Sequence, residues 1–171
     1  MAALARLIES TKGLMLRFVD GFDEASRTRQ GADLPNHLIW TLGHCALTMN
    51  KLSRMFDGMP VTESDFIEGD GARGDAVRFD TQSVCFGSVP VDDGDRYPTL
   101  ERGCEIYSAA CERLAQAVRE LVLNSVEETV LWHDAPIRVD DLISRIAFHN
   151  GAHSGQIMDL RRALGMPRVI H

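Results

Sequence analysis

Two histidines spaced four residues apart mark the most distinctive stretch of the chain, from Val139 to Gly165. Four residues of an α-helix advance about 400°, so the imidazoles of His149 and His153 should stand nearly one above the other. Apolar residues continue the same helical face before and after the pair: Leu142, Ile146, Ile157, Leu160 and Leu164. Both rings are therefore expected to face the interior.

A buried imidazole costs free energy unless its ring nitrogens find partners. One interpretation is a pair of core histidines that hydrogen-bond to backbone or side-chain oxygens. The other is a pair of metal ligands, because H-x-x-x-H is the smallest chelate that a helix can offer. The metal interpretation requires a third ligand from another element.

Hydrophobic periodicity predicts four helices, and start and stop residues bound them. Asp33 is a candidate cap for the second helix, with Pro35 in its first turn. Thr99 is a candidate cap for the third, and Gly165 ends the fourth. The predicted ranges run from about 3 to 24, 35 to 56, 99 to 122 and 140 to 165.

The segments between these helices carry weaker patterns. Residues 58–98 hold no long periodic stretch, only a possible short strand around Val77 to Phe79, so we expect a binding loop or lid. Ser125 and Glu128 have capping-box spacing and predict one short turn. The alternation in residues 129–139 would also fit a short hairpin. With no convincing sheet, the chain is predicted to be an all-α four-helix bundle with a long connection between helices two and three.

Composition favours a single soluble domain over residues 1–171. The 171 residues carry 18 Lys and Arg against 25 Asp and Glu, a formal charge of −7. No basic block supports binding to nucleic acid, and no apolar run approaches the length of a membrane span. No secretory signal is visible, so we expect a cytoplasmic protein without nucleic-acid or membrane partners.

A third histidine, His44, lies near the middle of the second predicted helix. Bundles commonly build metal sites from inward-facing side chains of neighbouring helices. If the second and fourth helices are neighbours, three imidazoles can converge and leave a coordination position open, which is the pattern of catalytic sites. We therefore expect Zn²⁺, or another divalent ion such as Ni²⁺, at His44, His149 and His153.

Three motifs in this order resemble the DinB/YfiT-like family of metalloenzymes over nearly the whole chain. They are W-x-x-G-H at Trp40, Y-P at Tyr97, and H-x-x-x-H-x-G-Q at His149. The resemblance implies a four-helix bundle, often a homodimer, with a divalent metal on His44, His149 and His153. Family members include transferases and isomerases that use low-molecular-weight thiols, which implies a small-molecule substrate and a thiol co-substrate here.

Other candidate residues surround this predicted centre. Trp40 lies one turn from His44 and could form one wall of a pocket, and the Gln156 amide could support a metal-binding histidine or face the substrate. His37 lies two turns, about 10 Å, from His44, too far for the first shell, and is expected at a pocket or the surface. His133 is expected at the surface. The leading hypothesis is a metal-dependent transferase or hydrolase without an identifiable general base, and the alternative is a non-catalytic metal-binding or scaffold protein.

Overall fold

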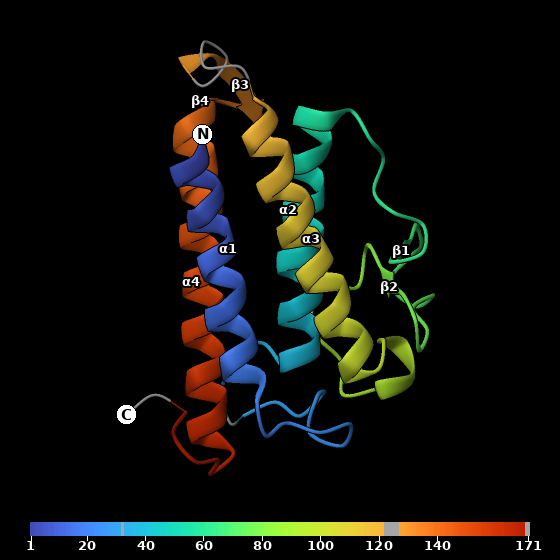
Figure 1. Cartoon of the computed structure of the whole chain (residues 1–171). Helices are drawn as coiled ribbons and strands as arrows, with labels where there is room; N and C mark the ends of the chain where they lie inside the picture. Colours follow the sequence, from blue (N-terminus) through green and yellow to red (C-terminus); the bar gives the residue numbers. More distant parts are fainter. Residues whose placement is uncertain (32, 122–126, 170–171) are drawn as a thin grey trace.

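Four long helices dominate the computed structural model, which describes residues 1–31, 33–121 and 127–169 (Figure 1). They are α1 (Ala2–Val19), α2 (Leu38–Asp57), α3 (Leu100–Glu120) and α4 (Val139–Ala163). The four predicted helices are confirmed. Among the described residues, none of these helices has the length and apolar character needed to cross a membrane.

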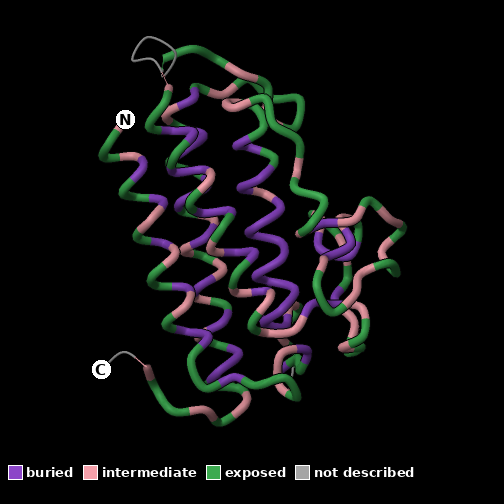
Figure 2. Tube along the Cα trace, turned by 45° about the vertical axis from the view of Figure 1, so that its right-hand side comes forward, coloured by how far each residue is buried: buried purple, intermediate pink, exposed green. Residues whose placement is uncertain are grey.

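Each of the four helices packs against two others. α1 contacts α3 and α4, and α2 contacts the same two helices, with the α2–α4 contact the least extensive of the four. Their buried positions face inwards along each helix (Figure 2). Large side chains that are almost fully buried, such as Met15, Leu42, Tyr107 and Ile143, fill the space between them. Burial of this apolar surface is the main stabilising contribution.

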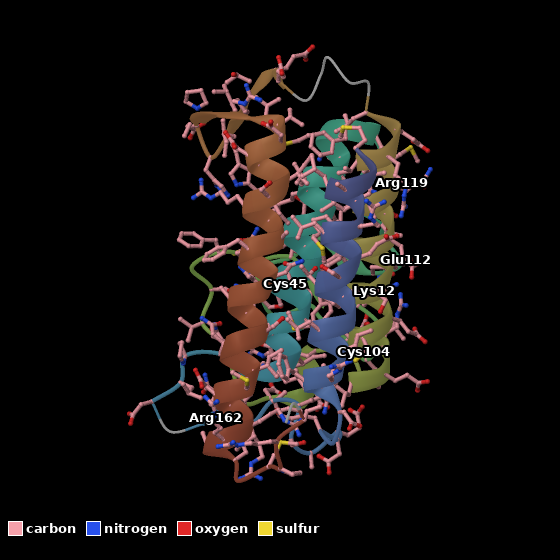
Figure 3. The ribbon with its side chains drawn as sticks, turned by 60° about the vertical axis from the view of Figure 1, so that its left-hand side comes forward. Lys12, Cys45, Cys104, Glu112, Arg119 and Arg162 are labelled. Carbon is pink, nitrogen blue, oxygen red and sulfur yellow. The ribbon has the colours of Figure 1, made fainter. Side chains whose placement is uncertain are left out.

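Ion pairs join α1 to α3 at the edge of this core. Lys12 donates to Glu112 over 2.8 Å, and Arg119 donates to Glu9 (Figure 3). These side chains are partly exposed, and such pairs contribute about 0–1 kcal/mol each. They contribute much less to stability than the apolar interior does.

Two predicted helix ends are displaced in the structure. α1 ends at Val19 rather than near residue 24, because the chain turns at Gly21 with a φ of 84°. α2 begins at Leu38, and its N-cap is His37, whose Nδ1 accepts from the backbone N–H of Trp40. Asp33 is not the cap, since it lies in a preceding turn with a φ of 62°. Histidine is not among the preferred capping residues, so the capping pattern in the sequence pointed to Asp33 instead of His37.

Two small sheets correct the expectation of an all-α chain. β1 (Phe66–Ile67) pairs in parallel with β2 (Phe79–Asp80), which overlaps the predicted strand around residues 77–79 at Phe79. β3 (Thr129–Trp132) pairs antiparallel with β4 (Ala135–Arg138), which confirms the hairpin alternative. Ser125, and with it the predicted capping box, lies outside the described residues.

The long connection between α2 and α3 is packed onto α2. Phe79 lies against Gly43, where an added Cβ would come within 2.6 Å of the Phe79 ring. Asp80 is fully buried, and its carboxylate accepts from the backbone N–H groups of Gly71, Arg73 and Gln82. The connection is thus held at a fixed place beside the middle of α2, where His44 lies.

Candidate metal centre

Three histidines from two helices converge between α2 and α4. One nitrogen from each of His44, His149 and His153 lies within 4.8 Å of the others. The two Nε2 atoms of His44 and His149 are 3.1 Å apart. Two nitrogens bound tetrahedrally to one Zn²⁺ at 2.0–2.1 Å would be about 3.3 Å apart. The spacing of this pair therefore fits a shared metal ion, and a ring nitrogen of His153 lies within 4.8 Å of both.

The other ring nitrogen of each histidine faces an oxygen of the protein. His44 Nδ1 lies 2.9 Å from the carbonyl oxygen of Val84, and His153 Nδ1 lies 2.8 Å from Oε1 of Gln156. His149 Nδ1 makes a longer contact of 3.4 Å with Oδ1 of Asn150. A carbonyl oxygen only accepts, so each Nδ1 carries the proton and each Nε2 keeps its lone pair.

This protonation pattern leaves the lone pairs of His44 Nε2 and His149 Nε2 facing each other at 3.1 Å. Two acceptors at that distance repel unless a proton or a cation lies between them. A metal ion satisfies all three nitrogens at once, and Nδ1–H groups bonded to protein oxygens are the usual outer shell of metal-binding histidines. The donor set thus fits a divalent transition metal.

Trp40 fixes the plane of the His44 ring. The two rings are stacked, with centroids 4.6 Å apart and an angle of 8° between their planes. The indole is itself held in place, because its Nε1–H donates to Oγ of Ser88 over 2.9 Å. Since the Trp40 side chain is buried, it acts here as a wall behind His44.

Burial keeps all three rings neutral at pH 7. Burial is the main cause that lowers the pKa of His44 and of His149, and it lowers the pKa of His153 to about 4, with the neighbouring His149 and His44 as further causes. A neutral imidazole is the form that binds metal, so no proton has to be released first. His149 and His153 are only half-buried, so part of each side chain is accessible to solvent.

Gln156 orients His153 from outside the cluster. Its Oε1 accepts from His153 Nδ1 and also from Nδ2 of Asn36, over 3.2 Å. The Asn36 amide thereby turns the oxygen of Gln156 towards the imidazole. This pair is the polar support that positions the third nitrogen.

Gln156→Leu is expected to weaken Zn²⁺ binding by about tenfold, because loss of an outer-shell partner of a metal-binding histidine typically costs 10–100-fold. Gln156→Glu keeps an acceptor for His153 Nδ1 and should bind at least as tightly as the wild type. Competition titration against a chromophoric chelator measures both. Equal affinities for the Leu and Glu variants would show that Gln156 does not support the site.

His37 is fully buried and is not part of the cluster of three histidines. Its Nδ1 caps α2 through the N–H of Trp40, and its Nε2 donates to the carbonyl oxygen of Val91 over 3.1 Å. The edge of the Tyr97 ring packs against it at 5.0 Å between centroids. His37 thus ties the end of the connection to the start of α2. His133, by contrast, is exposed in the turn between β3 and β4, as expected.

His37 should make the stability of the protein depend on pH. Burial lowers its pKa from 6.5 to about 4, because the charged imidazolium would lose its hydration, and protonation of Nδ1 would also remove the cap. Its contribution is complete above pH 6.5 and is lost as the pH falls towards 4, a change on the order of 3 kcal/mol. Asparagine caps helices and does not titrate there. Chemical denaturation of metal-free protein should therefore show a weaker pH dependence for His37→Asn, and identical dependences would contradict this role.

Several supporting residues could not be found from the sequence. Val84 contributes only its backbone carbonyl, so its side chain gives no signal. Asn36 and Asn150 lie next to histidines, but nothing in their spacing marks them as partners of Gln156 and His149. Of the glycines near the histidines, Gly43 allows a close approach, whereas a Cβ at Gly151 or Gly155 would meet nothing within 4 Å.

Comparisons with known proteins bear on the family and the fold of the chain. The family model described as DinB superfamily matches residues 7–157. Among solved structures, the chain is similar to a conserved protein from Enterococcus faecalis, with a TM-score of 0.67 and 10% sequence identity. That alignment covers 95% of this chain and 96% of the other. No curated protein matches the sequence significantly. At this identity the structural match shows a shared fold alone.

Proposed function

The chain belongs to the DinB superfamily, and on that premise we propose that it is a divalent-metal-dependent enzyme acting on a small molecule. His44, His149 and His153 would hold the metal, with Zn²⁺ or Ni²⁺ as the preferred ions. One observation carries the proposal. One nitrogen from each of three neutral imidazoles lies within 4.8 Å of the other two, while the Nδ1 atom of each ring faces a protein oxygen.

The donor set supports catalysis better than a structural role. Three protein nitrogens leave at least one position of a tetrahedral site for a substrate or water, whereas structural sites are closed by four protein ligands. A bound metal would supply Lewis acidity, which lowers the pKa of a water or thiol that it binds. Thiol-dependent transfer to an electrophilic small molecule is the leading candidate reaction. Hydrolysis by a metal-bound water is the second candidate.

The protein's own residues hold the reacting centre in place. Val84, Asn150 and Gln156 fix which nitrogen of each ring faces the centre, and Trp40 excludes water from behind His44. The half-buried edges of His149 and His153 leave one side open to solvent. The proposal includes the expected four-helix bundle, a homodimer and a cytoplasmic location.

A non-catalytic metal-binding or scaffold protein of the same fold is the alternative. Spectroscopy of the Co²⁺-substituted protein separates the two. If the open position accepts a thiol, addition of a low-molecular-weight thiol should produce a sulfur-to-cobalt charge-transfer band. The same sample should then transfer the thiol to an electrophile such as 1-chloro-2,4-dinitrobenzene faster than His44→Ala does. A metal-loaded protein with neither the band nor turnover of thiol or ester substrates would favour the alternative.

A further inference from the structure

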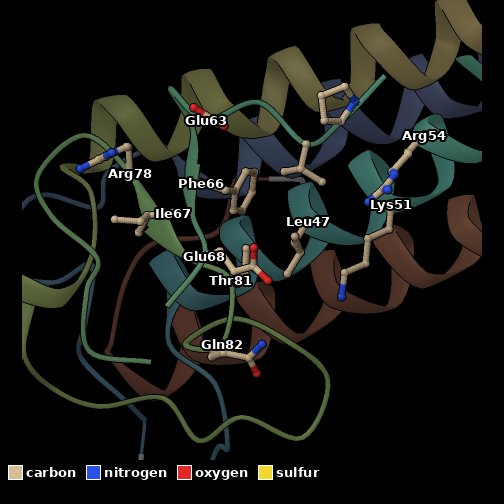
Figure 4. Close-up of a pocket in the computed structure, with 12 residues that line it drawn as sticks. Leu47, Lys51, Arg54, Glu63, Phe66, Ile67, Glu68, Arg78, Thr81 and Gln82 are labelled. Atoms are coloured by element: carbon tan, nitrogen blue, oxygen red, sulfur yellow. The ribbon is translucent and has the colours of Figure 1, made fainter. Parts of the chain in front are cut away.

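A cleft of about 770 Å³ lies between the second half of α2 and the connection that follows it (Figure 4). None of the three clustered histidines lines it. One wall is formed by side chains of α2, namely Leu47, Lys51 and Arg54. The facing wall comes from the connection and includes Phe66 and Glu68. We call this space the α2 cleft.

The α2 cleft begins beside the histidine cluster. Leu47 and Lys51 follow His44 by three and seven residues, so all three lie on one face of α2, and Lys51 is two turns or about 10 Å further along. On the opposite wall, Gln82 lies two residues before Val84, whose carbonyl oxygen bonds His44. A molecule extending from the histidines along this face of α2 would therefore enter the cleft.

The cleft combines charge with apolar surface. No ion pair involving Lys51 or Arg54 occurs within the part of the chain that the structure describes, and both side chains are exposed. Arg78, a third cation of the lining, is instead paired with Asp75 at 2.7 Å. Leu47 and Phe66 line the cleft between the charges and are both buried, and the half-buried Val61 and Ile67 add apolar surface to its lining. Two unpaired cations on one wall are placed for an anion.

The acidic residues restrict the kind of anion. Glu63 and Glu68 also line the α2 cleft. Their two negative charges offset those of Lys51 and Arg54, so the lining lacks the excess positive charge that a dianion such as a phosphate monoester requires. A carboxylate on an apolar chain matches both the two cations and the Leu47–Phe66 surface.

We propose that the α2 cleft binds the non-reacting end of the substrate, and that this end is an apolar chain with a terminal carboxylate. The carboxylate lies at Lys51 and Arg54, and the chain runs past Leu47 towards the three histidines. The assignment deepens the proposed function and rests on it, because it makes the cleft and the histidines two parts of one substrate site.

The first test measures binding to the metal-free full-length protein, with 4-phenylbutanoate and its neutral analogue 4-phenylbutanamide as probes. Isothermal titration should show that the carboxylate binds more tightly and that Lys51→Gln/Arg54→Gln weakens its binding by about tenfold. Arg6→Gln/Arg29→Gln removes the same charge from exposed positions outside the cleft and should leave the affinity unchanged. Equal binding of both probes, or equal losses in both double variants, would overturn the proposal.

The second test asks whether the cleft and the histidines form one site. In Co²⁺-loaded protein, paramagnetic broadening should be strongest for the phenyl protons of bound 4-phenylbutanoate and weaker for the methylene next to the carboxylate. Absent or reversed broadening would overturn the proposed orientation. Since the first test needs no metal, failure of the protein to take up Co²⁺ would count against the proposed function, separately from binding in the cleft.

Discussion

Replacing His44 with alanine is expected to lower the affinity for Zn²⁺ by about a hundred- to a thousandfold. Structural zinc sites with four protein ligands have binding free energies of about 10–16 kcal/mol, or roughly 3–4 kcal/mol for each ligand. His44 is the one ligand from α2, so its loss leaves only the two imidazoles of α4. His149→Ala and His153→Ala should each cause a loss of similar size.

The matched control is a histidine outside the centre. His133 is exposed in the β3–β4 turn with a φ of 48°, and asparagine tolerates that backbone conformation. Competition titration should therefore give the wild-type affinity for His133→Asn. If His44→Ala also bound Zn²⁺ as the wild type does, the metal would have to lie elsewhere.

Asp80→Ala is expected to destabilise the protein by about 3 kcal/mol or more. The substitution removes three part-buried hydrogen bonds from backbone N–H groups to one carboxylate, and a hydrogen bond to a charged group is worth about 1.5–3 kcal/mol. Because Asp80 lies four residues before Val84, the variant should also bind metal more weakly than the wild type. Chemical denaturation and Zn²⁺ titration measure the two effects.

Asp70→Ala provides the comparison within the same connection. Asp70 is exposed, and its carboxylate accepts one backbone N–H, that of Ala72 at 3.2 Å. Its replacement should change the free energy of unfolding by less than about 1 kcal/mol. Equal destabilisation by the two substitutions would mean that the buried carboxylate does not organise the connection.

The helices were predictable because their signals are local. Apolar residues recur at helical spacing along all four, and Thr99 is the N-cap of α3 as expected. The start of α2 was misplaced because its cap is the imidazole of His37, whose role depends on Val91 and Tyr97 from the far end of the connection. The β1–β2 pair joins two-residue strands twelve residues apart, too short to leave a periodic pattern.

The candidate site was predictable only in part for a similar reason. The i, i+4 spacing of His149 and His153 identifies a pair on one helix, and the motif around Trp40 adds His44 from another. What orients these rings comes from backbone and amide groups, such as the Val84 carbonyl and the Asn36–Gln156 pair, that carry no spacing rule. The α2 cleft arises from tertiary packing of the connection on α2, which no pattern in the sequence encodes.

The most direct test of the central claim is elemental analysis of protein purified without a polyhistidine tag or added metal, beside the His149→Ala/His153→Ala variant. The three converging imidazoles predict about one equivalent of a transition metal per wild-type chain and none in the variant. If neither sample contains metal and the wild type takes up neither Zn²⁺ nor Ni²⁺, the metal centre is contradicted, and His44, His149 and His153 are polar residues of a helical core.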